Sequence, residues 1–341
     1  MVTGTGIGSM PGADQHAYDE ALRTVLGELG EPPGLPYLPE VPGRGAVASM
    51  TGRGLAVVAE LGADLQPAGW RLTGGGTGVD HRRARSLLAQ DLDALEEQAQ
   101  GVTGTFKLQL PGPWTLACTV ERPRGDRVLG DHGARRELAQ ALAEGVGAHV
   151  ADVRRRLPGL DRLVVQVDEP VLGAVLEGRL PTASGLHRHR SVDRPEASQA
   201  LEWVLEAVTA AGAEPWVHSC AAGTPWPLVR GAGARGLLAD HAQLSAADHD
   251  ALAEAIEAGV HVGLGVLPAL DPSPAGGGGE AGATDAPATE AVLRWLDMLG
   301  LDPAEVGGLL AVSPACGLAG ASSAWARTAL STVRRVAVNL S

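Results

Sequence analysis

The sequence predicts a (β/α)8 TIM barrel, because short apolar runs alternate along it with longer segments of helical periodicity. Parallel strands covered by helices read as short, continuous apolar runs of this kind. The expected strands lie near Thr5–Ser9, Asp64–Trp70, Thr105–Leu110, Leu163–Val167, Pro215–Ser219, Gly236–Ala239, His261–Val266 and Leu309–Val312. About eight strand–helix units match the barrel, although a doubly wound sheet would show the same alternation.

Apolar residues at helical spacing predict the segments between the strands. The expected helices are Arg135–Arg155, Glu196–Ala211, Ala247–Ala258, Ala288–Leu299 and Ser322–Val338. We expect a single domain over residues 1–341, with a flexible Gly-rich loop near 272–287. That loop is expected to be a tolerated insertion, and a lid over the barrel mouth is the alternative.

Composition excludes several classes of function. The formal net charge of −13 disfavours binding to nucleic acid or to an anionic membrane surface. Cys118, Cys220 and Cys316 form an odd set with no paired framework, which indicates a reducing compartment. No basic, apolar leader opens the sequence and no apolar run approaches the ~20 residues that span a bilayer, so we expect a cytoplasmic protein.

A candidate metal site combines residues almost a hundred positions apart. His218 and Cys220 end one expected strand, and residues two apart on a strand point to the same side. Cys316 follows the last expected strand, and in a barrel both positions lie on the catalytic face. Imidazole and thiolate are the ligands that zinc prefers. Asp240, after the next strand, is the expected fourth ligand, with His241 as the alternative; Asp240 could instead cap a helix or lie in a solvated loop.

Three further motifs are candidates for substrate binding and catalysis. Asp168 and Glu169 end an apolar strand, and adjacent strand residues face opposite ways, so one is expected to accept a substrate ammonium and the other to hold a neighbouring loop. Ile7–Gly8–Ser9 ends the first strand, where backbone N–H groups and the Ser9 hydroxyl could hold a carboxylate. Pro111–Gly112–Pro113 predicts a tight loop that a ligand can approach.

Together these motifs resemble the cobalamin-independent methionine synthase family, in its C-terminal catalytic barrel. The matching pieces are Ile7–Gly8–Ser9, Leu110–Pro111–Gly112–Pro113 with Thr115, Gln166–Val167–Asp168–Glu169–Pro170, Val217–His218–Ser219–Cys220 and Ser313–Pro314–Ala315–Cys316–Gly317–Leu318. Each piece is weak alone, but five in the family's order span nearly the whole chain and are specific.

The resemblance implies methyl transfer to the thiol of homocysteine, giving methionine, at a zinc ion held by His218, Cys220 and Cys316. It also implies that Ile7, Ser9 and Asp168 hold homocysteine, and that Glu40 meets the substrate ammonium. The family's fourth zinc ligand is usually a glutamate, and Asp240 stands near its place.

The departures from the family concern the methyl donor. Thr119 stands where the folate-using enzymes carry a tryptophan, and Ala174 where they carry an acid after the Asp-Glu-Pro motif. The chain looks more like the short, single-barrel branch, which favours a methylated corrinoid protein over methyltetrahydrofolate as donor. The alternatives are another thiol methyltransferase, a uroporphyrinogen decarboxylase-like barrel enzyme, or a non-catalytic protein that binds a thiol amino acid or metal.

Overall fold

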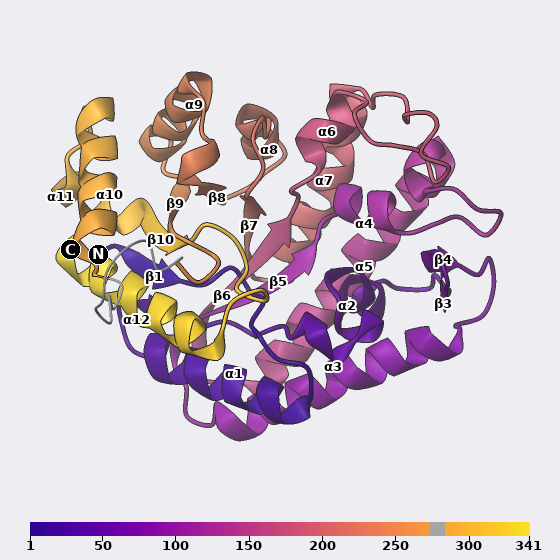
Figure 1. The fold of residues 1–341 in the computed structure, drawn as a ribbon, viewed down its shortest axis with the longest axis horizontal. Coiled ribbons are helices and arrows are strands. Elements are labelled where there is room, and N and C mark those ends of the chain that lie inside the picture. The colour runs from indigo at the N-terminus through magenta and orange to yellow at the C-terminus, as the bar shows by residue number, and fades with distance from the viewer. Residues whose placement is uncertain (273–283) are drawn as a thin grey trace.

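The computed structural model describes residues 1–272 and 284–341, where eight parallel strands nearly close into a barrel surrounded by helices (Figure 1). The strands run around the barrel in the order β2-β1-β10-β9-β8-β7-β6-β5. Their bounds are β1 Thr3–Thr5, β2 Gly34–Leu35, β5 Gly104–Pro111, β6 Leu160–Asp168, β7 Glu214–Ser219, β8 Gly236–Asp240, β9 His261–Leu267 and β10 Leu310–Pro314. The predicted fold class is confirmed.

The barrel closes where the chain beyond β2 meets β5. A parallel bridge pairs Tyr37 with Lys107. The Leu38 N–H donates to the Lys107 carbonyl at 3.0 Å, and the Lys107 N–H donates to the Pro36 carbonyl at 2.9 Å. Proline has no N–H to donate, and the prolines in 32–42 keep β2 short.

One expected barrel strand is wrong. Residues 64–70 belong to an antiparallel hairpin outside the barrel, formed by β3 (Ala63–Gln66) and β4 (Gly69–Leu72). The missing barrel strand is β2, which is too short to show a period and lies in a Pro-rich segment where no strand was expected. The first strand also ends earlier than expected, at Thr5.

The five expected helices are confirmed to within three residues at each end, and seven more lie among the described residues. The bounds are α1 Gln15–Leu29, α2 Met50–Val57, α3 Val79–Gln98, α4 Pro113–Thr119, α5 His132–Arg156, α6 Leu172–Leu176, α7 Arg194–Ala210, α8 Trp226–Gly231, α9 Ala246–Glu257, α10 Ala286–Leu299, α11 Pro303–Val306 and α12 Ser323–Asn339. Most of the predicted Gly-rich loop, 273–283, falls outside the described residues, and its last two residues begin α10. No helix in the described ranges is long and apolar enough to cross a membrane.

Alternation along the strands divides the core into two parts. On β6, Leu163, Val165 and Val167 point outward toward the helices, where they belong to the main core cluster. Val164 points inward, where it meets apolar side chains from other strands. That inner cluster consists of Ile7, Leu35, Val164, Trp216, Leu238 and Ala311. Two and four residues beyond Val164, the same face of β6 carries Gln166 and Asp168, so the apolar floor gives way to polar side chains toward the carboxyl ends of the strands.

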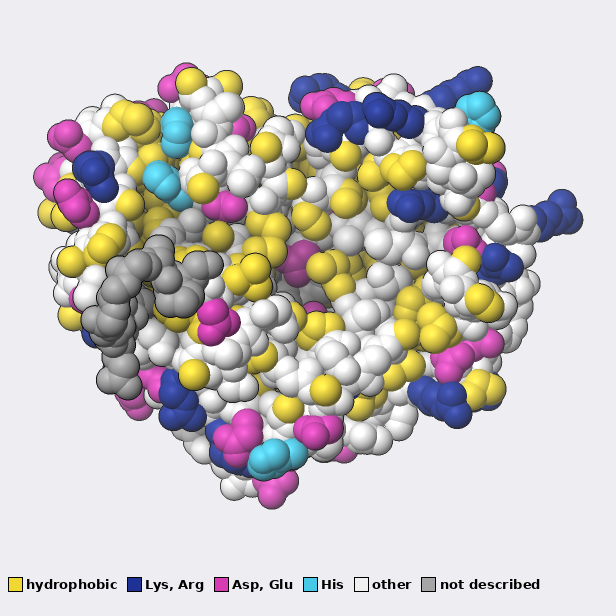
Figure 2. Space-filling model, in the orientation of Figure 1, with side chains coloured by type: hydrophobic (Ala, Val, Ile, Leu, Met, Phe, Trp, Pro, Cys, Tyr) yellow, Lys and Arg dark blue, Asp and Glu magenta, His cyan; other side chains and the backbone are white. Residues whose placement is uncertain are grey.

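The carboxyl ends of the strands lie under a depression of the surface. Figure 2 shows a hollow near the centre of the view, where Figure 1 places β5, β6 and β7. Acidic side chains are visible at the bottom of that hollow (Figure 2). Active sites of TIM barrels lie at this end of the strands.

Candidate metal and substrate site

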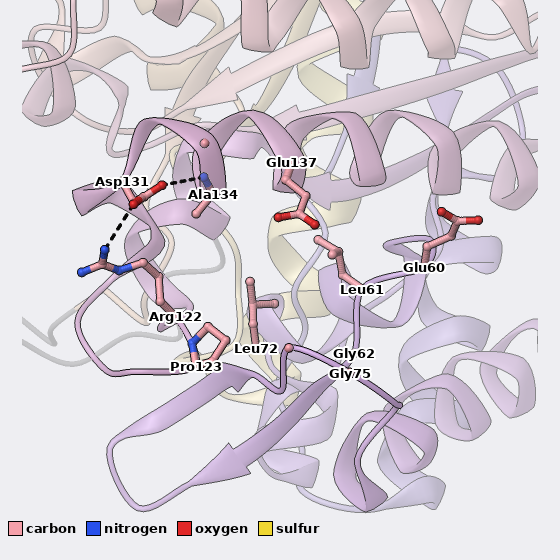
Figure 3. A pocket seen from close by; sticks show the side chains of 12 residues that line it. Glu60, Leu61, Gly62, Leu72, Gly75, Arg122, Pro123, Asp131, Ala134 and Glu137 are labelled. Atoms are coloured by element: carbon pink, nitrogen blue, oxygen red, sulfur yellow. Dashed lines mark hydrogen bonds and ion pairs between the residues drawn. The ribbon is translucent and has the colours of Figure 1, made fainter.

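A pocket of about 590 Å³ on the outer wall is unrelated to the predicted site (Figure 3). It lies between the β3–β4 hairpin and the start of α5, and none of the predicted site residues lines it. Arg122 there pairs with Asp131 at 3.5 Å, and Asp131 accepts from the Ala134 N–H at the first turn of α5 at 2.9 Å. Arg122 and Asp131 thus make structural contacts, and this pocket is not the candidate catalytic or metal site.

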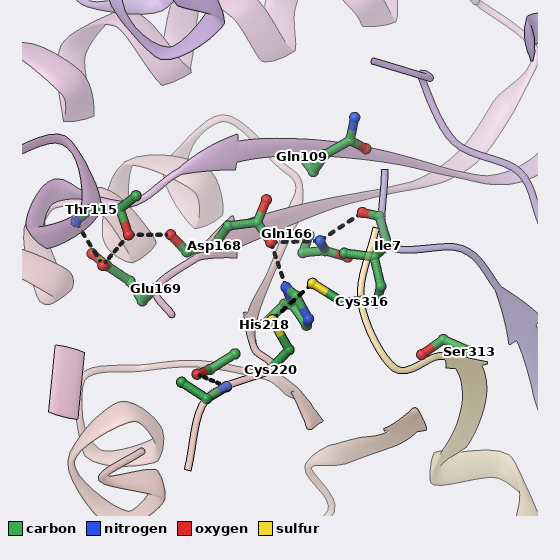
Figure 4. A network of polar contacts seen from close by, with 12 residues as sticks. Ile7, Gln109, Thr115, Gln166, Asp168, Glu169, His218, Cys220, Ser313 and Cys316 are labelled. Carbon is green, nitrogen blue, oxygen red and sulfur yellow. Dashed lines mark hydrogen bonds and ion pairs between the residues drawn. The ribbon is translucent and has the colours of Figure 1, made fainter. Parts of the chain in front are cut away.

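The side chains of His218, Cys220 and Cys316 form one compact group. Their potential ligand atoms all lie within 4.8 Å of one another. His218 lies in β7, Cys220 directly follows that strand, and Cys316 follows β10. Across the barrel mouth the two sulfur atoms approach to 2.8 Å (Figure 4). Two distant parts of the sequence therefore converge, as the motif analysis predicts.

The orientation of His218 leaves one ring nitrogen free to ligate. Its Nδ1–H donates to Asp168 Oδ1 at 2.8 Å (Figure 4). Its Nε2 is buried and has no hydrogen-bond partner. A carboxylate on one ring nitrogen is the usual outer partner of a metal-bound histidine, since it fixes the tautomer that exposes the other nitrogen. Two sulfurs and this nitrogen make a donor set that fits a borderline-soft ion such as zinc.

The two thiols share their protons unequally. The hydrogen bond between them lowers the pKa of Cys316 and raises the pKa of Cys220. The first proton therefore leaves the pair easily, and the S–H of Cys220 then stabilises the Cys316 thiolate. Thiolate is the form that binds metal. Both thiols are half-buried, whereas Cys118 is buried within α4 and is not part of this group.

Asp240 lies at the end of β8 but outside the group of three ligands. Its carboxylate accepts from the Ala242 N–H at 3.0 Å and caps a short 3-10 helix over His241–Gln243. This is the capping arrangement that the sequence left open as an alternative. A fourth ligand from Asp240 or His241 remains a prediction.

Asp168, the last residue of β6, and Glu169, which follows it, point in opposite directions. Glu169 Oε1 accepts from the Trp114 N–H at 2.8 Å, and its Oε2 accepts from the Thr115 N–H and hydroxyl at 2.9 and 2.8 Å. Desolvation by burial raises the pKa of Glu169 to about 8. Glu169 thus fixes the start of α4 and points away from the sulfur atoms (Figure 4). A catalytic role for it remains a prediction.

The loop Pro111–Gly112–Pro113 is approached closely, but by a side chain of the protein itself. A Cβ on Gly112 would overlap the Glu169 carboxylate. Glycine at this position therefore allows the Glu169 side chain to pack against the start of α4. The space that was expected to admit a ligand is occupied by the Glu169 carboxylate.

The segment Ile7–Gly8–Ser9 lies between Glu40 and the loop that carries Cys316. On one side the Glu40 N–H donates to the Gly8 carbonyl at 3.1 Å. On the other, the Leu318 N–H donates to the Ser9 carbonyl at 2.8 Å, two residues beyond Cys316. Ser9 is half-buried, and its backbone is bonded to the loop that carries Cys316 and bridged to Glu40.

Glu40 is a buried carboxylate beside this segment. Gln109 Nε2 donates to it at 3.3 Å, and Arg53 lies at 3.5 Å. Desolvation raises the pKa of Glu40, the Arg53 charge lowers it, and the negative charge of Asp168 raises it further. Two carboxylates that repel each other in one partly dry site favour an incoming cation such as an ammonium group.

Several buried polar residues were missed as site residues. Lys107 and Gln109 alternate with apolar residues on β5, and Arg53 lies behind Glu40. Gln166 was part of a motif but had no assigned role. The available signal was a lysine between apolar residues of an expected strand, because a charged residue is almost never fully buried unless it is paired.

A comparison with known protein families identifies the family of this chain. The family described as "Cobalamin-independent synthase, Catalytic domain" matches residues 124–339, well over half of the chain. The chain belongs to this family. The match includes Asp168, His218, Cys220 and Cys316, while Ile7–Ser9 and Glu40 precede it.

Membership of the cobalamin-independent synthase family makes the protein a methyltransferase-type barrel enzyme acting on thiols. The family is metal-dependent, and the group of His218, Cys220 and Cys316 can bind a metal ion. No curated protein matches the chain.

Three solved structures with distant similarity to the chain illustrate its structural relatives. The apo form of 3-keto-D-glucoside 4-epimerase, YcjR, from E. coli is 15% identical, covering 73% of this chain and 86% of its own, with a TM-score of 0.37. Oxaloacetate acetylhydrolase in complex with 3,3-difluorooxalacetate is 12% identical (65% and 71% covered, TM-score 0.25). A Xaa-Pro dipeptidase with bound methionine is 13% identical (75% and 70% covered, TM-score 0.27). Similarity this low carries no argument about activity.

Proposed function

We propose that residues 1–341 act as one catalytic domain that transfers a methyl group to the thiol of homocysteine at a zinc ion, giving methionine. The observation that carries the proposal is the convergence of His218, Cys220 and Cys316, together with the bare, buried Nε2 of His218. This donor set suits zinc, and a catalytic zinc keeps one position for substrate.

Each residue has a separate task in this proposal. Cys220, Cys316 and His218 Nε2 hold the ion, and Asp168 keeps the His218 proton on Nδ1. When bound, zinc supplies Lewis acidity that favours the thiolate over the thiol of homocysteine, whose free pKa is about 8.5. The thiol proton passes to solvent, the new C–S bond forms as the bond between the methyl carbon and its donor breaks, and the donor keeps that electron pair.

The amino acid part of homocysteine is assigned to polar groups beside the metal ligands. The backbone of Ile7–Gly8–Ser9 and the Ser9 hydroxyl receive the carboxylate. Glu40 receives the ammonium, because it is a buried acid whose charge is only partly balanced by Arg53 at 3.5 Å. Asp168 adds negative charge on the same side, so these groups orient the thiol toward the metal ligands.

We infer that the donor is a methylated corrinoid protein rather than methyltetrahydrofolate. Thr119 is exposed at the end of α4, and its hydroxyl donates to the Thr115 carbonyl at 2.9 Å. Ala174 in α6 offers no polar group. Neither residue supplies the aromatic surface or the acid that the folate-using members carry at these positions.

The metal assignment is tested by elemental analysis of the purified chain and of Cys316→Ser. We expect about one zinc per chain in the parent protein, since the three ligands form a single mononuclear site. The variant loses a thiolate ligand and should lose most of its zinc, whereas Cys118→Ser, outside the group, should retain it. Full zinc retention by Cys316→Ser would contradict the proposal.

The reaction is tested by supplying homocysteine with methylcobalamin or with methyltetrahydrofolate and measuring methionine. We expect turnover with methylcobalamin as the corrinoid probe. Efficient turnover with methyltetrahydrofolate alone would overturn the donor assignment. A panel of other thiols identifies a different acceptor, and binding of homocysteine without turnover under either donor would argue for a non-catalytic role.

A further inference from the structure

A lysine is buried inside the barrel, beneath the proposed metal site. Lys107 lies on β5, and its side chain is fully buried. No carboxylate lies within ion-pair distance of its amine among the described residues. Its Nζ donates instead to two neutral acceptors, Gln166 Oε1 at 2.6 Å and the Ile7 carbonyl at 3.1 Å. Burying an amine is costly, so this placement calls for a compensating role.

The amine determines which way the Gln166 side chain faces. The lysine ammonium can only donate, so the oxygen of the Gln166 amide faces Lys107. The amide nitrogen then points the other way, where it donates to Asp168 Oδ1 and to the Ile7 carbonyl, each at 2.8 Å (Figure 4). If the amide were reversed, its oxygen would face two acceptors and its NH2 would face a donor. Lys107 excludes that arrangement.

The Asp168 carboxylate connects this pair to the metal ligand. Asp168 Oδ1 accepts from Gln166 and also from His218 Nδ1–H at 2.8 Å. The Nε2 of His218 is left with a bare lone pair beside the two sulfurs. Donation in this series therefore converges on Asp168, from Lys107 through Gln166 in the barrel floor and from His218 at the mouth, which leaves Nε2 of His218 as the acceptor.

We propose that Lys107 is a positioning residue that sets the orientation of Gln166 and, through Asp168, holds His218 with Nε2 presented for metal binding. The same amine holds the Ile7 carbonyl, so it also fixes the segment assigned to the substrate carboxylate. This inference rests on the proposed function, because it assumes that His218 ligates the metal.

The charge state of Lys107 does not alter this role. Desolvation lowers the pKa of Lys107 to about 7, while the charges of Asp168 and Glu40 oppose the decrease. A neutral amine still has two N–H groups, one for each acceptor. It also has a lone pair, but the Asp168 carboxylate and the Ile7 carbonyl can only accept and keep the Gln166 amide in the same orientation. The ammonium form has a third N–H, and Nζ also lies 5.1 Å from the centre of the Tyr37 ring.

The experiment measures zinc affinity, by competition with a chromogenic chelator, in four variants. Lys107→Met and Gln166→Met remove the donor and the relay. Lys107→Gln keeps a shorter N–H donor without charge. Thr5→Val is the matched control, because Thr5 is buried in strand β1 of the same barrel. Its hydroxyl donates to the Leu35 carbonyl at 2.9 Å and the Gly6 carbonyl at 3.3 Å, outside the series.

We expect Lys107→Met and Gln166→Met to bind zinc about 10- to 100-fold more weakly, the usual loss for an outer partner of a metal ligand. Lys107→Gln should lose less than Lys107→Met, and Thr5→Val should stay within about twofold of the parent protein. Zinc affinity unchanged in both methionine variants would overturn the inference. If Lys107→Met fails to fold in a urea titration, Gln166→Met and Lys107→Gln decide the matter.

A measurement without metal separates this inference from the proposed function. Nitrogen-15 NMR of the metal-free protein reports which ring nitrogen of His218 carries the proton. We expect Nδ1–H in the parent protein and in Thr5→Val. In Lys107→Met we expect a mixture of the two tautomers, because Gln166 is then free to turn and no longer holds the Asp168 carboxylate against His218 Nδ1. An unchanged tautomer in Lys107→Met would overturn the inference even if zinc binds. A parent protein with the Nδ1–H tautomer that binds no zinc would instead overturn the proposed function.

Discussion

Replacing Asp168 separates the hydrogen bond that orients His218 from the negative charge behind it. Asp168→Ala removes the acceptor for two buried donors, His218 Nδ1–H and the Gln166 amide. Each unsatisfied buried donor costs about 1–3 kcal/mol, so the free energy of unfolding should fall by about 2–6 kcal/mol. A typical domain has only about 5–15 kcal/mol in total, so this variant should be strongly destabilised.

Asp168→Asn retains an oxygen that can accept from both donors and loses only the charge. A hydrogen bond to a charged group contributes about 1.5–3 kcal/mol and a neutral one about 0.5–1.5 kcal/mol, a difference of about 1 kcal/mol. We therefore expect zinc affinity to fall about fivefold in Asp168→Asn, since about 1.4 kcal/mol corresponds to a factor of ten. In Asp168→Ala the loss should reach about 10- to 100-fold.

The assay is chelator competition for zinc affinity, combined with urea unfolding at pH 7 of the metal-free proteins. Thr5→Val again provides a variant that loses a buried hydroxyl donor elsewhere. If Asp168→Asn lost as much affinity as Asp168→Ala, charge rather than orientation would be the dominant contribution. If neither variant changed zinc affinity, Asp168 would have no part in holding His218 for the metal, and the reasoning would be refuted.

Three further predictions concern the surrounding residues. Glu169 has a folded pKa of about 8, above its unfolded value of ~4.3, so between these two pH values the native state binds one proton more than the unfolded state. The free energy of unfolding should therefore fall as pH rises from ~4.3 to ~8. Urea titrations across that range should show a flatter pH dependence for Glu169→Gln, and an equally steep dependence would contradict the assignment. Gly112→Ala should displace the Glu169 carboxylate and lower the free energy of unfolding by about 1–3 kcal/mol, whereas Gly147→Ala on α5, where a Cβ meets open space, should not destabilise the protein. Glu40→Gln should raise KM for homocysteine about tenfold with a much smaller change in kcat, because it weakens ammonium binding without touching the metal ligands, and a loss confined to kcat would argue against that role.

The candidate site was predictable where its residues lie at the ends of recognisable strands. His218 and Cys220 are two apart on β7, and Cys316 follows β10, so the barrel topology alone brings them to one face. Asp168 and Glu169 were expected to differ for the same reason of strand alternation, and they do. Asp240 follows β8 by the same logic, but its carboxylate caps the next turn, a local choice that strand position does not determine.

The sequence by itself determined the barrel class and the residues that converge at its mouth, because periodicity and strand ends are local properties that any barrel of this topology translates into position. Only the tertiary structure showed that Gly34–Leu35, rather than 64–70, supplies a barrel strand, because a two-residue strand has no period and is defined by its neighbours. It alone revealed the buried series from Lys107 to His218, because hydrogen bonds between residues 50 to 100 positions apart depend on how the strands register across the barrel.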